Sequence, residues 1–256
     1  MTDVILRVEN LSVRYNGSHA LEDVSLAVHE GEQVAIVGPN GAGKSTFFKA
    51  LVGLIPPLSG SIWTDAAEMA YVTQRSAVDW TFPVTVHDVV MMGRIGKMGW
   101  FRWQRPRDRE IVQRSLAQVG MEELANRQIG ELSGGQQQRV FIARALAQEA
   151  RILLMDEPFS GVDAAAQEAI LELLQVLPRS GVTVLVSTHD LSLAVERFDR
   201  IALLNRRLVA YGLPRQVIRP ETLAAAYGGQ AVWRGEDYAL VLGDIDCCGE
   251  GGHRHG

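Results

Sequence analysis

The first residues with clear chemical potential form a glycine-rich loop. It reads Gly38-Pro39-Asn40-Gly41-Ala42-Gly43-Lys44-Ser45-Thr46 and fits the pattern G-x-x-x-x-G-K-[ST]. An apolar run precedes it and a helical pattern follows, which is the context that this pattern requires. Glycines let backbone N–H groups wrap phosphates, and the helix N-terminus adds partial positive charge. We predict that the loop binds ATP, with Lys44 on the β- and γ-phosphates and Ser45 on Mg²⁺.

Two acids end a second apolar run. The segment reads Arg151-Ile152-Leu153-Leu154-Met155-Asp156-Glu157-Pro158. Ligands of α/β sheets bind beyond the carboxyl ends of strands. We therefore expect Asp156 to hold the Mg²⁺ shell and Glu157 to polarise the attacking water as general base. Alone, the segment could also be a strand that stops at a charged turn; beside the phosphate loop, the catalytic interpretation is favoured.

A second glycine motif, here called the signature segment, opens a later helical pattern. It reads Leu132-Ser133-Gly134-Gly135-Gln136-Gln137-Gln138-Arg139 and has no local phosphate to bind. Its simplest use is the nucleotide of another copy of the chain, across a dimer interface. Ser133 can also cap its own helix. This motif predicts a homodimer that ATP closes.

Hydropathy patterns predict the elements that position these residues. Residues 4–28 alternate apolar and polar residues, as in a half-buried antiparallel sheet. Continuous apolar runs of buried parallel strands, separated by helical segments, indicate a parallel α/β core. Residues 76–130 predict an inserted, mostly helical subdomain. The strand runs lie at Val34–Val37, Met69–Val72, Ile152–Met155, Val182–Val186 and Ile201–Leu204.

Composition narrows the class of protein. The chain has 256 residues and a net charge of −5, which argues against nucleic acid as a partner. No apolar run approaches the roughly 20 residues that span a bilayer, and no signal peptide is predicted. Residues 231–246 read as a C-terminal extension and 247–256 as a disordered tail. The tail carries Cys247, Cys248, His253 and His255, which could bind a transition metal or could be incidental.

The order and spacing of these motifs resemble the ATPase subunit of an ATP-binding-cassette transporter, over roughly residues 4–230. The resemblance implies a P-loop cassette fold and adds roles for further residues. Tyr15 would stack on adenine, although it could be an exposed strand tyrosine. Gln74 would touch Mg²⁺ and report to a membrane partner, and His189 would sense the γ-phosphate. The residues implied to act on the partner's nucleotide are Ser133, Gly134, Gly135 and Gln136, with Asp163 coupling the two sites; Gly161-Val162 departs from the family's usual Ala-Leu.

Residues 74–110 resemble the manganese/zinc/iron importer branch of that family. The resemblance implies a homodimer docked on polytopic permease subunits, at the cytoplasmic face of the bacterial plasma membrane. An extracytoplasmic substrate-binding protein would act indirectly. The aromatic residues of the segment suit a partner groove or a small local core: Trp80, Phe82, Trp100, Phe101 and Trp103. Alternatives are an importer ATPase for another cargo, such as an iron-siderophore chelate or a vitamin, and a soluble cassette ATPase without transport.

Overall fold

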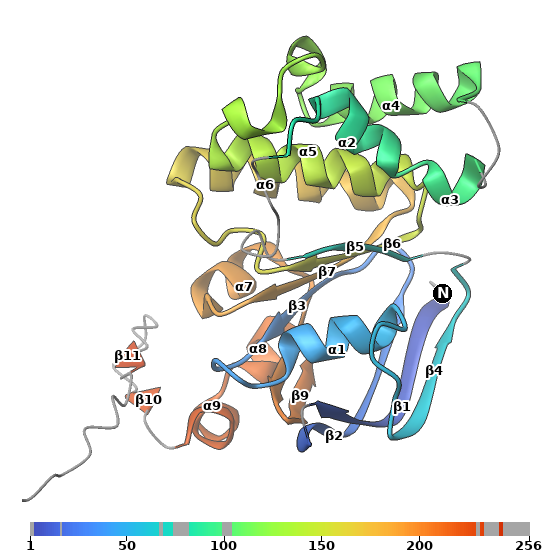
Figure 1. Ribbon diagram of the computed structural model, residues 1–256. Coiled ribbons are helices and arrows are strands. Elements are labelled where there is room, and N and C mark those ends of the chain that lie inside the picture. Colours follow the sequence, from blue (N-terminus) through green and yellow to red (C-terminus); the bar gives the residue numbers. More distant parts are fainter. Residues whose placement is uncertain are drawn as a thin grey trace, which may run out of the picture.

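The described residues form an α/β structure with a six-stranded sheet, a three-stranded sheet, a small two-stranded sheet and a helical layer (Figure 1). The structure is a computed structural model, and it describes residues 3–15, 17–66, 69–73, 82–98 and 104–228, together with the backbone of 231–232 and 241–242. The predicted α/β class, the N-terminal antiparallel sheet and the helical insertion are all confirmed. Within the described ranges, the helices lack the length and apolar character needed to cross a membrane.

The antiparallel sheet has the strand order β2-β1-β4. It contains β1 (Val4–Tyr15), β2 (Ser18–His29) and β4 (Ser59–Thr64). Alternate residues of β1 and β2 are buried, as the period of two predicts. The sequence did not predict β4, because only Ile62 and Trp63 of its six residues are apolar and Trp63 faces solvent.

The core sheet has the order β5-β6-β7-β3-β8-β9. Neighbouring strands from β5 to β8 run parallel, and β9 pairs antiparallel with β8. The predicted apolar runs all became parallel strands, whereas the partly exposed edge strand β9 was not predicted. The strands are β3 (Gln33–Val37), β5 (Met69–Val72), β6 (Ile152–Asp156), β7 (Thr183–Thr188), β8 (Arg200–Asn205) and β9 (Arg207–Gly212).

This sheet separates two apolar clusters. Val34 and Ile36 of β3 face the antiparallel sheet together with Phe47 and Phe48 of α1 (Lys44–Leu51). The alternate residues Ala35 and Val37 face the opposite cluster, which includes the helical layer (Figure 1). That layer contains α2 (Val86–Met92), α3 (Ile95–Met98), α4 (Pro106–Gln118), the 3₁₀ turns η2 (Glu122–Leu124) and η3 (Ile129–Glu131), and α5 (Gly134–Ala147).

The remaining elements follow β6 along the chain. Helix α6 begins after Asp163 and packs beside α5. The elements are α6 (Ala164–Val176), η4 (Leu177–Ser180), α7 (Leu191–Arg197), α8 (Pro214–Val217), α9 (Pro220–Tyr227), β10 (Ala231–Val232) and β11 (Val241–Leu242). Several sequence predictions lie outside the described residues: Gln74, Trp80, Trp100, Phe101, Trp103 and the tail 247–256.

A buried arginine ties the helical layer together. Arg94, just after α2, is 4% exposed, and its Nε lies 3.1 Å from Asp108 Oδ1 of α4. Its Nη1 donates to Ala147 O and to Glu149 Oε2, both at 2.8 Å. Because this guanidinium, just after α2, bonds both α4 and the end of α5, it helps to hold the helical layer as a unit.

Candidate nucleotide site

The glycine-rich loop lies between β3 and α1, and close packing explains two of its glycines. Gly43 has φ 97°, and a Cβ there would lie 2.6 Å from Ala20 O of β2. A Cβ on Gly38 would lie 1.9 Å from Leu204 O of β8. Larger residues at these positions would displace the loop from the strands on either side. The glycines therefore fix the loop against both sheets as well as freeing its N–H groups.

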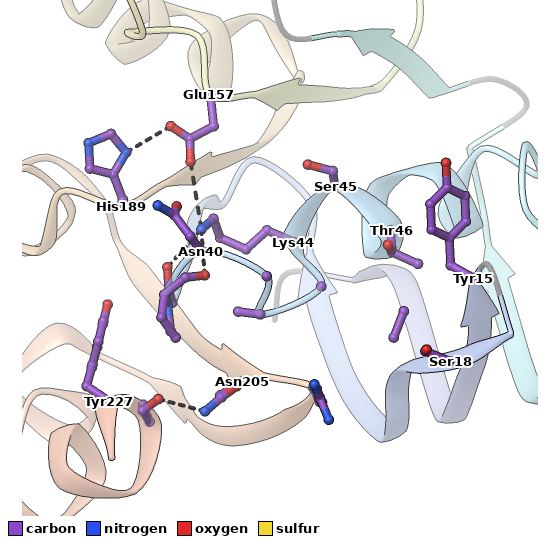
Figure 2. A pocket seen from close by; sticks show the side chains of 18 of the residues that line it. Tyr15, Ser18, Asn40, Lys44, Ser45, Thr46, Glu157, His189, Asn205 and Tyr227 are labelled. Atoms are coloured by element: carbon purple, nitrogen blue, oxygen red, sulfur yellow. Dashed lines mark hydrogen bonds and ion pairs between the residues drawn. The ribbon is translucent and has the colours of Figure 1, made fainter. Parts of the chain in front are cut away.

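The loop borders a cavity of about 1260 Å³ (Figure 2). Such a space is ample for a nucleotide-sized ligand. Every predicted loop residue lines it: Gly38, Pro39, Asn40, Gly41, Ala42, Gly43, Lys44, Ser45 and Thr46. Tyr15, Glu157 and His189 line it too, so the structure brings these predicted site residues together from distant parts of the sequence.

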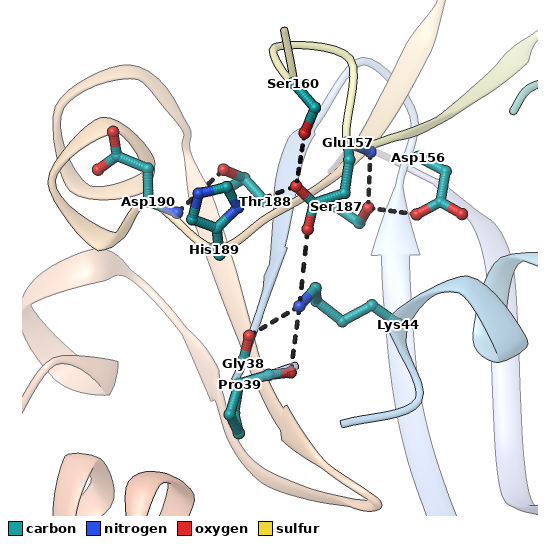
Figure 3. A network of polar contacts seen from close by, with 10 residues as sticks. All are labelled: Gly38, Pro39, Lys44, Asp156, Glu157, Ser160, Ser187, Thr188, His189 and Asp190. Carbon is teal, nitrogen blue, oxygen red and sulfur yellow. Dashed lines mark hydrogen bonds and ion pairs between the residues drawn. The ribbon is translucent and has the colours of Figure 1, made fainter. Parts of the chain in front are cut away.

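Lys44 stands at the centre of the polar groups. Its Nζ donates to Gly38 O at 2.8 Å and to Pro39 O at 3.2 Å, and lies 3.7 Å from Glu157 Oε1 (Figure 3). Burial lowers the pKa of Lys44, while the negative charges of Glu157 and Asp156 oppose that shift. The ammonium group lies at the wall of the cavity, where an anionic phosphate could bind it in competition with the Glu157 carboxylate.

Glu157 is held in an unusual conformation. Its φ is 50°, which is costly for a residue with a Cβ and is typical of functional positions. Its backbone N–H donates to Ser187 Oγ at 2.9 Å. The carboxylate oxygen Oε2 accepts from Ser160 Oγ at 3.1 Å and lies 2.9 Å from His189 Nδ1 (Figure 3). The side chain is thus aimed between Lys44 and His189, where a general base for water could act.

Asp156 is buried and anchored at both oxygens. It is 4% exposed; Oδ1 accepts from Ser187 Oγ at 2.6 Å, and Oδ2 accepts from Tyr71 Oη at 3.1 Å. Asp156 does not line the cavity, although Ser45 and the adjacent Glu157 do. The Asp156 carboxylate and the Ser45 hydroxyl are oxygen donors of the kinds that Mg²⁺ prefers, and Mg²⁺ at nucleotide sites takes further ligands from phosphates. Among the described residues, no three His, Cys, Asp or Glu side chains gather to hold a metal by themselves. This donor set fits a metal shared with a nucleotide.

Tyr15 lies at the edge of the cavity. Its side chain is 47% exposed, and Lys49 Nζ lies 5.8 Å from the ring centroid. Tyr15 is thus an exposed tyrosine at the end of β1, and its stacking on a nucleotide base stays a prediction. An exposed ring beside the phosphate loop is suited to stacking.

The signature segment and Asp163 do not line this cavity. Ser133 caps α5, accepting from Gln136 N at 3.3 Å, while the Gln136 side chain accepts from Ser133 N at 2.9 Å. The predicted capping role of Ser133 is confirmed. Asp163 caps α6 by accepting from Ala166 N at 2.8 Å, and the preceding Gly161 has φ 73°. That left-handed conformation explains a glycine at 161.

Sequence reasoning missed several residues of the site. Ser187 bonds both Asp156 and the backbone N–H of Glu157. Tyr71 bonds Asp156, and Ser160 bonds the Glu157 carboxylate. Ser187 could have been suspected because it precedes His189 by two residues at the end of a parallel strand. Tyr71 offers only the weak signal of one polar group in an otherwise apolar strand. Other cavity residues that were not predicted include Ser18, His19, Asn205 and Tyr227.

Comparison with known proteins agrees with this geometry. The family description ABC transporter matches residues 21–160. The manganese transport system ATP-binding protein MntB of Halalkalibacterium halodurans is 46% identical over 245 residues, covering 93% of this chain and 98% of that protein. The zinc transport system ATP-binding protein TroB of Treponema pallidum is 47% identical, covering 90% and 89%.

A solved structure extends the likeness to three dimensions. It is the dimeric structure of a post-hydrolysis state of the ATP-binding cassette MJ0796 bound to ADP and Pi. It is 30% identical, with a TM-score of 0.71 over 82% of this chain and 99% of that chain. The phosphate loop, the acids at the end of β6 and the near-full-length likeness lead to one conclusion. The chain belongs to the ABC transporter family and is one of its ATP-hydrolysing cassettes.

Proposed function

We propose that the chain is the ATP-hydrolysing subunit of a membrane importer for a divalent metal ion, namely manganese, zinc or iron. The observation that carries the cargo class is the 46% identity to a manganese transport ATP-binding protein over 98% of that protein's length. A likeness of this extent includes the surfaces that such a subunit presents to its transporter, and not the nucleotide site alone. Because a zinc transport protein is 47% identical, the proposal names a class of cargo, divalent metal ions, and not a single metal.

The site supports a division of labour in hydrolysis. Lys44 neutralises the β- and γ-phosphates, and the loop N–H groups of residues 38–46 hold them. Glu157 accepts a proton from the attacking water, and His189, 2.9 Å from Glu157, orients that carboxylate and contacts the γ-phosphate. Ser45 and Asp156, with Gln74, would hold Mg²⁺, which would supply positive charge to the phosphates.

A second copy of the chain would complete each site. Ser133 caps α5, Gly134, Gly135 and Gln136 form its first turn, and Asp163 caps α6 nearby; none of them lines the cavity of its own chain. A helix N-terminus suits a phosphate. The solved neighbour is a dimer bound to ADP and Pi, which supports a homodimer that binds nucleotide. Hydrolysis would weaken the closed dimer because ADP lacks the γ-phosphate that the second copy contacts.

Membrane subunits would dock on the helical layer. Exposed apolar side chains occur at its rim, with Phe82 61%, Ile95 58% and Met92 38% exposed. Such a rim suits a polytopic permease, with the cassette peripheral at the cytoplasmic face of the plasma membrane and a substrate-binding protein acting from outside. In this proposal the cassette spans residues 4–230 with its helical subdomain at 76–130, followed by an extension at 231–246 and the Cys/His tail at 247–256.

Uptake measurements test the proposal. Cells lacking the chromosomal copy of this gene are complemented with the parent chain or with Glu157→Gln, and accumulation of radioactive manganese, zinc, iron, a ferric siderophore and a vitamin is measured. The proposal expects one of the free metals to depend on the parent chain and not on Glu157→Gln. If only the uptake of the siderophore or the vitamin depended on the parent chain, the protein would be the ATPase of an importer for that other cargo. No dependent cargo would favour the soluble cassette.

A further inference from the structure

Tyr71 reaches the candidate magnesium carboxylate from a different strand. In the parallel pairing of β5 with β6, Tyr71 lies opposite Leu154. Side chains two residues apart share a sheet face, so Tyr71 lies on the face of Asp156. Its hydroxyl donates to Asp156 Oδ2 at 3.1 Å. This oxygen is the one that Ser187 leaves free, because the Ser187 hydroxyl donates to Oδ1.

The ring of Tyr71 is itself held in place. Phe48 of α1 meets it edge-on, with ring centroids 6.4 Å apart and an interplanar angle of 71°. Phe48 is fully buried and lies four residues after Lys44 on the same helix. Tyr71 therefore connects the helix of the phosphate loop to the acids of β6.

The Asp156 carboxylate is also attracted by the Lys44 ammonium group, and this attraction competes with the hydrogen bonds from Tyr71 and Ser187. Its negative charge acts on the buried Lys44 ammonium, which already lies 3.7 Å from Glu157. A carboxylate with only one anchored oxygen could rotate toward that ammonium. A carboxylate with both oxygens anchored keeps one orientation, and a metal ligand must keep its orientation to bind well.

We propose that Tyr71 is a positioning residue for the magnesium site: its hydroxyl fixes the Asp156 carboxylate for Mg²⁺–ATP and keeps it from turning toward Lys44. Tyr71 touches neither nucleotide nor metal in this role. The inference rests on the magnesium site of the proposed function. It adds a residue that links metal affinity to β5, the strand that leads toward residue 74.

The test compares two Tyr→Phe variants, each of which removes one hydroxyl group. Tyr71→Phe keeps the ring against Phe48 and removes the bond to Asp156. Tyr211→Phe is the matched control, because Tyr211 is partly buried on β9, at the opposite edge of the sheet, and its hydroxyl has no partner within the described structure. Both are made in full-length Glu157→Gln protein, so that ATP survives. Calorimetry measures ATP affinity in EDTA and over a series of Mg²⁺ concentrations.

Tyr71→Phe should raise, by about tenfold, the Mg²⁺ concentration at which half of the gain in ATP affinity is reached. An effect of about tenfold is typical when one hydrogen bond to a charged group is lost. ATP affinity in EDTA should match that of Tyr211→Phe. An Mg²⁺ midpoint within twofold of the control, or below it, overturns the role of Tyr71 while leaving the magnesium site intact. If Mg²⁺ fails to change ATP affinity in the Glu157→Gln parent, the magnesium site and the role of Tyr71 are both wrong.

Discussion

Gly135 of the signature segment faces Ala166 of α6, and a Cβ on Gly135 would lie 2.2 Å from the Ala166 Cβ. The contact joins the starts of two helices, one capped by Ser133 and the other by Asp163. Both caps belong to the surface proposed to meet the second copy's nucleotide. The missing Cβ of Gly135 is therefore required inside one chain, whatever the backbone N–H does across the dimer.

Gly135→Ala should destabilise the chain, and Ala166→Gly should rescue it. Overpacking a tight contact costs about 1–3 kcal/mol. Removing the opposing methyl group of Ala166 restores the space and so recovers the lost stability. The recovery is reduced by up to about 1 kcal/mol, because a glycine in a helix is itself destabilising. Urea unfolding of both single variants and the double variant measures the coupling. If the double variant is no more stable than Gly135→Ala, the contact with Ala166 is not the reason for the glycine.

Glu157→Gln should keep ATP binding and lose turnover. Loss of a general base typically slows a reaction about 10²–10⁴-fold. Binding should be at least as tight as in the parent, because the carboxylate 3.7 Å from Lys44 no longer competes with phosphate for that ammonium. Steady-state hydrolysis and calorimetry check the two parts, and sizing chromatography with ATP should show a dimer. A parental rate of hydrolysis would remove Glu157 from the mechanism.

Mixed dimers should show that each site uses two chains. Lys44→Ala should lose tight ATP binding because no ammonium remains for the phosphates, and Ser133→Arg should bind ATP yet fail to close, because its cation opposes the α5 N-terminus. Neither variant alone forms a complete site. Their mixture can form one complete site per mixed dimer, so ATPase activity should partly return. Normal hydrolysis by Ser133→Arg alone would exclude the signature segment from the site.

The residues that sequence patterns predicted share a local signal. Gly38 to Thr46 and the acids after Ile152–Met155 are recognisable because their pattern and their position after an apolar strand lie within one short segment. Parallel strands read clearly because both faces are buried. Strands β4 and β9 have mixed, partly exposed residues, and their pairing partners lie far along the chain, so no local pattern marks them.

Tyr71 and Ser187 show why the rest of the site needed the structure. Each lies within an apolar strand and meets Asp156 only through the strand register, in which Tyr71 pairs with Leu154 and Asp156 with Ser187. Register between strands separated by 31 or more residues is not encoded in either strand alone. The left-handed φ of Glu157 is equally invisible, because glutamate carries no preference for it.

Asp108→Asn should destabilise the helical layer with a defined pH dependence. Breaking a buried ion pair typically costs about 3–5 kcal/mol, and a value near the lower end is expected because Glu149 still faces Arg94. Burial by itself would raise the pKa of Asp108, but hydrogen bonds from Arg105 N and Arg94 outweigh it and leave the pKa below the ordinary 3.8. A carboxyl with a depressed folded-state pKa stabilises fully above its unfolded pKa and loses that contribution as pH falls through the folded value. Urea unfolding should therefore show a constant gap between parent and variant from pH 7 to pH 5, with narrowing only below about pH 4.

The matched control for Asp108→Asn is Arg114→Gln. It removes a neighbouring charge whose side chain is 65% exposed and 3.7 Å from Glu149. An exposed ion pair contributes about 0–1 kcal/mol, so this variant should stay close to the parent at every pH. If Asp108→Asn cost no more than Arg114→Gln at pH 7, the buried pair of Arg94 and Asp108 would not hold α2 to α4. The helical layer would then owe its integrity to the apolar contacts of α5 with α2 and α4.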